Sequence, residues 1–200
     1  MDLSADAGVF EGGFSDPVFG SQAVFRGVMD ALANPGRIVD LGQSALPPAP
    51  LSPAAGAVLA TLADYNTPVW FEADAPNASA WLAFHTGAPV TDNPDEADFA
   101  VLAKNSAVAG WSRFATGTAS YPDRSATLLL PVDDLRAGAA LQLRGPGIES
   151  TITIAPSGLP DDFQAAMTAN AKLFPLGFDL LLLCGSEVIG LPRTTRITEA

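Results

Sequence analysis

Hydrophobic residues gather in two nearly continuous runs, which predict buried strands. Residues 178–184 (FDLLLLC) form the longer run, which is too short for an ordinary helix and ends at Gly185. A strand covered on both faces of a sheet has this pattern, so we expect this run to be the central strand. Residues 125–132 (SATLLLPV) form the other run, and Pro131 predicts that this strand ends there or lies at an edge of the sheet.

Local signals between these runs predict the helices and the shorter strands. Asp16-Pro17 and Ser52-Pro53 each place a capping side chain before a proline, at the start of apolar residues with helical spacing. Helices are predicted over residues 16–34, 52–63, 77–85, 106–115 and 160–173, the last with Asp161 and Asp162 at its positive end. Strands are predicted over residues 37–39, 68–71 and 98–103, and an antiparallel hairpin over residues 140–143 and 151–154.

This alternation of helices and buried strands predicts an α/β fold, with a mixed β-sheet flanked by helices. A single domain over residues 1–200 is long enough to bury about 70% of the surface of the unfolded chain. Residues 1–13 (MDLSADAGVFEGG) are small, acidic and rich in glycine, which predicts a loose N-terminal segment.

The charge of the chain restricts its partners. Twenty-two Asp or Glu residues outnumber 10 Lys or Arg residues, which gives a formal net charge of −12. Nucleic acids and anionic lipids need clustered positive charge, so we expect neither as a partner. The N-terminus lacks a secretory signal, and no apolar stretch approaches the roughly 18 residues that cross a bilayer. These features predict a cytoplasmic protein.

Residue counts and missing motifs argue against several kinds of catalytic site. One His and one Cys cannot supply the ligands of a zinc site, and Cys184 in the apolar run is expected to be an inert core thiol. Phosphate-binding glycine motifs and the serine-hydrolase elbow are absent. The carboxylates between Asp92 and Asp98 are explained best by a solvated turn, and Lys104 by an exposed strand end. We therefore predict no metal and no cofactor.

Two polar groups remain as candidates for a binding site. His85, at the end of a short predicted helix, is the only candidate for a general base near neutral pH, and a contact with the helix end is the alternative explanation. Arg193, Thr194 and Thr195 could together bind a phosphate or a carboxylate. The alternative is that Arg193 pairs with a carboxylate of the chain while the threonines continue a strand.

Short segments in order along almost the whole chain carry a family resemblance. They are residues 16–19 (DPVF) with Gln22, Phe25 and Arg26, residues 62–70 (LADYNTPVW), 84–89 (FHTGAP), 97–100 (ADFA), 145–148 (GPGI), 174–180 (FPLGFDL) and 192–195 (PRTT). With these segments the chain resembles the H subunit of the bacterial carbon-phosphorus lyase core complex, the PhnH family. The last two segments, which frame the longest apolar run, are the most diagnostic.

The resemblance implies several properties beyond the residue pattern. The fold would be similar to the large domain of pyridoxal-phosphate-dependent transferases, without the cofactor. The chain would form a homodimer that joins the G, I and J subunits of a complex for phosphonate utilisation. That complex helps to transfer a phosphonate onto the ribose of ATP, giving a ribose 1-phosphonate 5-triphosphate and releasing adenine. The J subunit later cleaves the carbon-phosphorus bond.

These implications leave three hypotheses for the chain itself. The leading hypothesis is an accessory subunit that is essential to the complex but contributes no catalytic residue. The alternative is direct binding of a nucleotide or phosphonate through Arg193, Thr194, Thr195 and His85. The third hypothesis, an independent pyridoxal enzyme, would depend on Lys104. No catalytic residue is predicted, and whether the isolated chain is an enzyme stays open.

Overall fold

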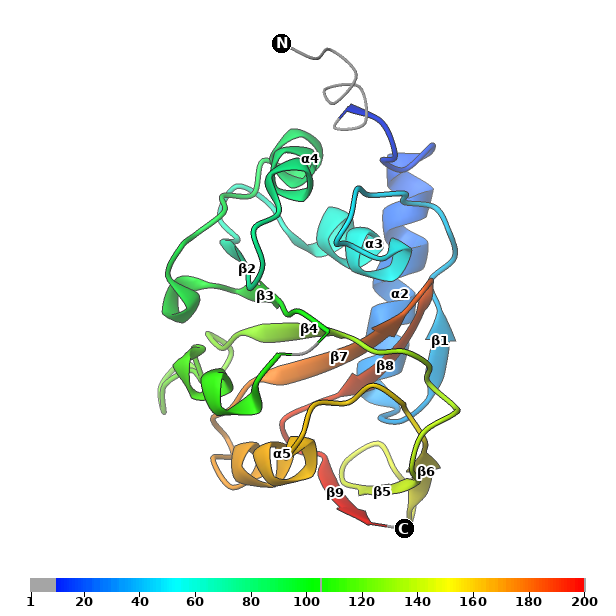
Figure 1. The fold of residues 1–200 in the computed structure, drawn as a ribbon, viewed down its shortest axis with the longest axis vertical. Coiled ribbons are helices and arrows are strands. Elements are labelled where there is room, and N and C mark those ends of the chain that lie inside the picture. Colours follow the sequence, from blue (N-terminus) through cyan, green and yellow to red (C-terminus); the bar gives the residue numbers. More distant parts are fainter. Residues whose placement is uncertain (1–9, 105, 200) are drawn as a thin grey trace.

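A six-stranded mixed sheet forms the centre of the computed structural model, which describes residues 10–104 and 106–199 (Figure 1). The strand order is β1-β8-β7-β4-β3-β2, in which β2, β3, β4 and β7 are parallel and β8 is antiparallel to β7 and to β1. These strands are β1 (Ile38–Asp40), β2 (Val69–Phe71), β3 (Phe99–Val101), β4 (Thr127–Pro131), β7 (Asp179–Cys184) and β8 (Glu187–Leu191). The predicted α/β architecture with a mixed sheet is confirmed, and its likeness to the pyridoxal-phosphate transferases stays a prediction.

The longest apolar run forms β7, which lies inside the sheet between β4 and β8. Leu180 and Leu182 contribute to one hydrophobic core, and Leu181 and Leu183 contribute to the other. Successive side chains of a strand point to opposite faces, so a strand between two cores has no position that needs a polar residue. The predicted central strand is confirmed.

β4 also lies inside the sheet, between β3 and β7. Pro131 is its last residue, so the prediction that the strand ends at this proline is confirmed, and the alternative of an edge strand is wrong. The missing N–H of this proline does not end the contact with β7, because the next N–H group, that of Val132, donates to the Leu183 carbonyl at 2.9 Å.

Three helices cover one face of the sheet (Figure 1). They are α2 (Pro17–Ala33), α3 (Pro53–Leu62) and α4 (Pro76–Thr86), close to their predicted positions. The Asp16 carboxylate accepts hydrogen bonds from the N–H groups of Val18 and Phe19, each at 3.1 Å, and Ser52 Oγ accepts one from Ala55. These side chains satisfy N–H groups that the helices leave free, as the capping pattern predicted.

The opposite face carries α5 (Phe163–Ala171) and the 3₁₀ helix η2 (Val108–Arg113). The predicted α-helix over residues 106–115 is thus shorter and more tightly wound, with Gly110 inside it. The predicted helix over residues 160–173 begins only at Phe163, because Asp162 has a left-handed backbone with φ of 60°. Asp162 is the N-cap of α5 and Asp161 precedes it, so both acidic residues lie at the positive end of the helix, as predicted, just before its first turn.

A second, three-stranded sheet has the order β6-β5-β9. Its strands are β5 (Leu141–Arg144), β6 (Ile152–Ile154) and β9 (Arg196–Glu199), and the predicted hairpin of β5 and β6 is confirmed. β8 and β9 were not predicted as strands. Glycine is uncommon inside a strand, but a Cβ atom at Gly190 of β8 would lie 2.6 Å from the carbonyl oxygen of Ala31, so this glycine allows α2 to pack closely on the strand.

Most of the predicted loose segment, residues 1–9, lies outside the described residues. In the described part, Trp81 Nε1 donates a hydrogen bond to the Glu11 carbonyl at 2.9 Å, and the Leu46 N–H donates one to Gly12 at 2.8 Å. These bonds hold residues 10–13 against α4 and the connector after β1. Within the described residues, no helix is both long enough and apolar enough to cross a membrane.

Candidate functional site

The four parallel strands begin at the same edge of the sheet, which we call the amino edge. It comprises the segments before those strands, residues 64–68, 92–98, 116–126 and 174–178. Backbone N–H groups connect neighbouring segments: Asp98 donates to Pro68 at 2.9 Å, Thr127 to Asp98 at 2.8 Å, Gly177 to Thr116 at 2.9 Å and Asp179 to Ala126 at 3.2 Å. The amino edge is therefore one hydrogen-bonded surface rather than a set of independent loops.

Arg193, in the turn after β8, lies against this edge. Its Nη2 is 2.6 Å from Asp179 Oδ2, and its Nε donates to Asp179 Oδ1 at 3.2 Å. Nη1 donates to the Pro122 carbonyl at 2.6 Å, and Nη2 also donates to Ser125 Oγ. Every nitrogen of the guanidinium thus has an acceptor within the chain, which favours the ion-pair interpretation of Arg193.

The two threonines beside Arg193 form part of a turn. The Thr195 N–H donates to the Pro192 carbonyl at 2.8 Å, and β9 begins only at the next residue. The alternative in which the threonines continue a strand is therefore wrong. Thr195 is buried, and its Oγ1 has no hydrogen-bond partner among the described residues, whereas Thr194 is half-buried.

His85 lies in a different part of the fold, in the last turn of α4. Its ring packs on Trp81 and Phe84, with centroid separations of 4.8 Å and 5.0 Å, and a Cβ atom at Gly13 would lie 2.6 Å from the imidazole. Nε2 is buried without a partner among the described residues, beside a cavity of about 340 Å³. The helix ends at Gly87, which has a φ of 73°. The imidazole of His85 therefore lies at the end of α4, packed against aromatic rings and covered by the N-terminal segment.

The structure therefore divides the predicted binding residues into two places. Arg193, Thr194 and Thr195 adjoin the amino edge, while the contacts of His85 come from α4 and the N-terminal segment. No contact joins the two groups within the described residues, and a ligand-binding role for any of the four stays a prediction.

The opposite edge, where the parallel strands end, contains a partly open cavity of about 310 Å³. Ligands of parallel α/β sheets commonly bind at this carboxyl edge. The first N–H groups of α3 are already used here, because Ala54 donates to the Gly185 carbonyl and Ala55 donates to Ser52. Lys104 forms an ion pair with Asp133. The walls are mainly apolar, so this cavity lacks the polar cradle that a triphosphate needs.

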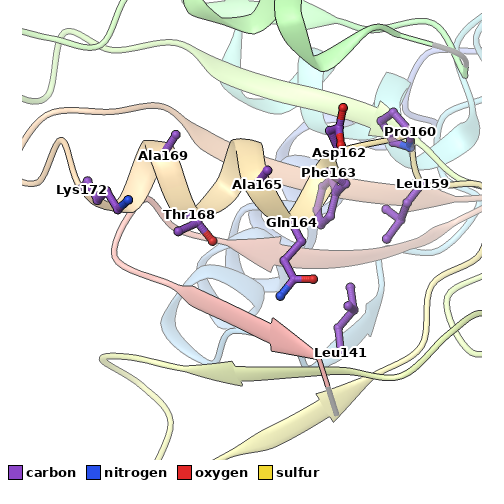
Figure 2. A pocket seen from close by; sticks show the side chains of 10 residues that line it. All are labelled: Leu141, Leu159, Pro160, Asp162, Phe163, Gln164, Ala165, Thr168, Ala169 and Lys172. Carbon is purple, nitrogen blue, oxygen red and sulfur yellow. The ribbon is translucent and has the colours of Figure 1, made fainter.

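Another hollow, of about 660 Å³, is an open groove along α5. In Figure 2, Gln164 and Thr168 point toward β5 and β9, whereas Asp162, Ala165 and Ala169 point to the other side of the helix. A catalytic site requires polar groups that converge on one point, and the polar groups of this groove do not. None of the predicted site residues lines it.

The pKa values of Asp98 and Glu187 are shifted, each for a clear physical reason. Partial loss of hydration, followed by repulsion from Asp64, raises the pKa of Asp98 on the amino edge, although Asp98 still reaches solvent. Hydrogen bonds from Arg136 lower the pKa of Glu187, despite a smaller opposing effect of desolvation. Among the described residues, no group of three or more His, Cys, Asp or Glu side chains could hold a metal ion.

Comparison with known proteins identifies the family. The family model described as "Bacterial phosphonate metabolism protein (PhnH)" matches residues 12–198. The chain belongs to the PhnH family. It is 50% identical over 197 residues to the alpha-D-ribose 1-methylphosphonate 5-triphosphate synthase subunit PhnH of Rhizobium meliloti (strain 1021), covering 98% of each chain. It is 31% identical over 176 residues to the putative C-P lyase subunit protein HtxG of Stutzerimonas stutzeri, covering 88% of this chain and 85% of the relative.

The resemblance inferred from short segments is thus confirmed, and the structure shows where several of these PhnH segments meet. Residues 64–68, 97–98, 174–178 and 192–195 gather at or against the amino edge. Sequence reasoning placed each segment beside a strand but did not bring the segments together. The available signal was that three of them directly precede a predicted strand, because parallel strands begin at one edge.

Proposed function

We propose that this chain is an accessory, non-catalytic subunit of a phosphonate-processing enzyme complex in the cytoplasm. The relative from Rhizobium meliloti is named as a subunit of alpha-D-ribose 1-methylphosphonate 5-triphosphate synthase, and the one from Stutzerimonas stutzeri as a putative C-P lyase subunit. In this role the chain supports the transfer of a phosphonate onto the ribose of ATP, with release of adenine, but supplies no reacting group.

The main support for this proposal is that the Arg193 side chain already binds groups of the chain itself. Arg193 is the strongest candidate for binding a phosphonate or triphosphate, yet each of its guanidinium nitrogens donates to an acceptor of the chain itself. To bind a ligand anion, Arg193 would have to release Asp179, a partner in a largely buried pair. This arrangement favours a structural role for residues 192–195, one of the two most diagnostic segments of the family.

A second copy of the chain is the proposed partner for the exposed side of α2. Val18, Gln22, Phe25 and Met29 recur at three- and four-residue spacing, lie on one side of the helix and are all exposed. This α2 stripe is uncharged. On a chain of net charge −12, an uncharged stripe can meet its own copy without the repulsion that acidic surfaces would produce.

The amino edge is the proposed contact for the G, I or J subunits. Tyr65 is 75% exposed, Phe174 62% and Tyr121 52%, which places large aromatic groups on a surface held in shape by its own hydrogen bonds. Aromatic side chains are enriched at protein interfaces. Asp64 and Asp98 add negative charge, so a basic face of another subunit would complement this surface.

Affinity purification of the tagged chain from cells grown on methylphosphonate tests the proposed role. We expect the G, I and J subunits to elute with the wild-type chain. The double variant Tyr65→Ala and Phe174→Ala should recover much less of them, while Leu46→Ala, which removes an exposed apolar residue elsewhere, should recover them normally. A wild-type chain that elutes alone under these conditions would overturn the proposal.

Direct binding of a nucleotide or phosphonate is the second candidate function. The observation that favours it is that three buried side-chain polar atoms lack partners among the described residues, and two of them, Thr195 Oγ1 and His85 Nε2, belong to predicted site residues. Thr195→Val removes the hydroxyl but keeps the shape of the side chain. Titration of ATP and of methylphosphonate into the complex should then show weaker binding for this variant, and unchanged binding would count against this function.

A further inference from the structure

The carboxyl-edge cavity has properties that neither the accessory role nor the PhnH segments explain. It lies where β2, β3, β4 and β7 end, under the first turn of α3. The residues that line it include Phe71, Val101, Leu129 and Leu183. All four belong to or pack against the core between the sheet and helices α2, α3 and α4. The cavity is thus lined by the ends of strands that are neighbours in the sheet.

Small residues make the space. Ala55 of α3 and Ala73, which follows β2, line the cavity at positions where a larger side chain would fill part of it. The resulting volume is about 310 Å³. A dry apolar cavity of about 150 Å³ is known to bind benzene, so this cavity can hold a larger hydrocarbon group, such as a substituted aromatic ring.

The rim supplies one positive charge. Lys104 lines the cavity, and its ammonium group pairs with Asp133, with both side chains 56% exposed. An ion pair this exposed contributes little to stability, so the ammonium group can exchange Asp133 for the anion of a ligand at small cost. The Ser52 hydroxyl also lines the cavity, where it accepts a hydrogen bond from Ala55 and keeps its own proton to donate.

The charges around Lys104 define the side on which an anion could bind. Asp133, Asp161 and Asp162 line the neighbouring hollow on the other side of Lys104, and they disfavour an anion there. No carboxylate is among the residues that line the carboxyl-edge cavity. An organic anion would therefore bind Lys104 on the side of the cavity, with its apolar group inside the cavity.

We propose that the carboxyl-edge cavity is a binding site for a small hydrophobic organic anion, with its apolar group enclosed by the strand ends and its anionic group at Lys104. The site is distinct from the amino edge and from Arg193, and it does not depend on the proposed accessory function. Phosphonates and carboxylates share the required chemistry, so the experiment includes one probe of each kind.

Calorimetric titration of the purified full-length chain with phenylphosphonate, benzoate and neutral benzyl alcohol tests the site. We expect at least one of the two anions to bind more tightly than benzyl alcohol. Lys104→Gln should weaken the binding of that anion by about tenfold, because it removes a charge-assisted contact, and should leave the binding of benzyl alcohol unchanged. Lys172→Gln is the matched control, since it removes the only other lysine, which lies in the groove along α5.

A second variant tests the cavity itself rather than the lysine at its rim. Ala73 is exposed at the cavity mouth, so Ala73→Phe should fold normally while it blocks the entrance and abolishes binding of all three probes. Tighter binding of phenylphosphonate than of benzoate would assign the site to phosphonates, and the reverse order would assign it to carboxylates. The proposal is overturned if neither anion binds at millimolar concentration, as expected if a partner's side chain fills the cavity. Equal effects of Lys104→Gln and Lys172→Gln, or unchanged binding in Ala73→Phe, would also overturn it.

Discussion

The guanidinium of Arg193 and the carboxylate of Asp179 close the open end of the β7–β8 hairpin. Nη2 lies 2.6 Å from Oδ2, and Oδ1 accepts hydrogen bonds from Nε at 3.2 Å and from the Arg193 backbone N–H at 2.8 Å. Asp179 is the first residue of β7, and Arg193 follows β8 by two residues. The pair thus fixes the point at which the central strand enters the sheet.

Arg193→Ala should lower the free energy of unfolding by about 2–4 kcal/mol, because it leaves the Asp179 carboxylate without its partner in a largely buried position. Urea denaturation measures this loss. Arg37→Ala is the control, since Arg37 pairs with Asp30 at an exposed site and should change stability by less than about 1 kcal/mol. Equal losses in the two variants would contradict the structural role of Arg193.

Asn170→Ala should be similarly costly, at about 2–4 kcal/mol. The buried Asn170 side chain donates to the Phe178 carbonyl at 2.9 Å and accepts from the Phe178 N–H at 3.0 Å, so it satisfies both backbone groups at the entry to β7. Thr168→Ala, an exposed change on the same helix, should stay within about 0.5 kcal/mol. Thermal unfolding of both variants measures the difference, and a tolerated Asn170→Ala would mean that other groups satisfy Phe178.

Lowering the pH should remove the contribution of the Glu187–Arg136 pair to the stability of the folded chain. Arg136 donates two hydrogen bonds of 2.6 Å to the Glu187 carboxylate, which holds the pKa of Glu187 below its ordinary value of 4.5. A lowered pKa in the folded state stabilises the protein above pH 4.5, and that stabilisation is lost as the pH falls through the lowered pKa.

Comparison of the wild-type chain with Glu187→Gln tests this pH dependence. The wild type should unfold at a higher temperature than the variant at pH 7, and the difference should shrink at about pH 3. Glu149→Gln, an exposed change in the hairpin turn, provides the reference for a general effect of charge. A difference that stays constant across this range would show that the pair contributes nothing that depends on protonation.

Phe25→Glu should convert the proposed homodimer into a monomer, because it places a charge in the middle of the uncharged α2 stripe. Sedimentation equilibrium measures the mass of the particle. Ala23→Glu introduces the same charge at an exposed position of the same helix outside the stripe, and should leave the dimer intact. A monomeric wild-type chain would refute the homodimer, and dissociation by both variants would refute the assignment to this stripe.

Several features of the fold could be predicted because their causes are local. The continuous leucines of β7 reflect a strand between two cores, and Asp16 and Ser52 cap their helices through neighbouring N–H groups. The failures have local causes too. Gly190 is unusual inside a strand but allows α2 to pack closely on β8, and the left-handed Asp162 delays the start of α5.

The sequence by itself determined the class of the fold, the central strand, the starts of α2 and α3 and the family, since all of these depend on neighbouring residues or on short segments. Only the tertiary structure decided the partners of Arg193, which lie 14, 68 and 71 residues away in the chain. It alone also gathered separate segments at the amino edge and left a cavity at the opposite edge. Contacts of this kind follow from the order and direction of strands, which the pattern of any one segment does not encode.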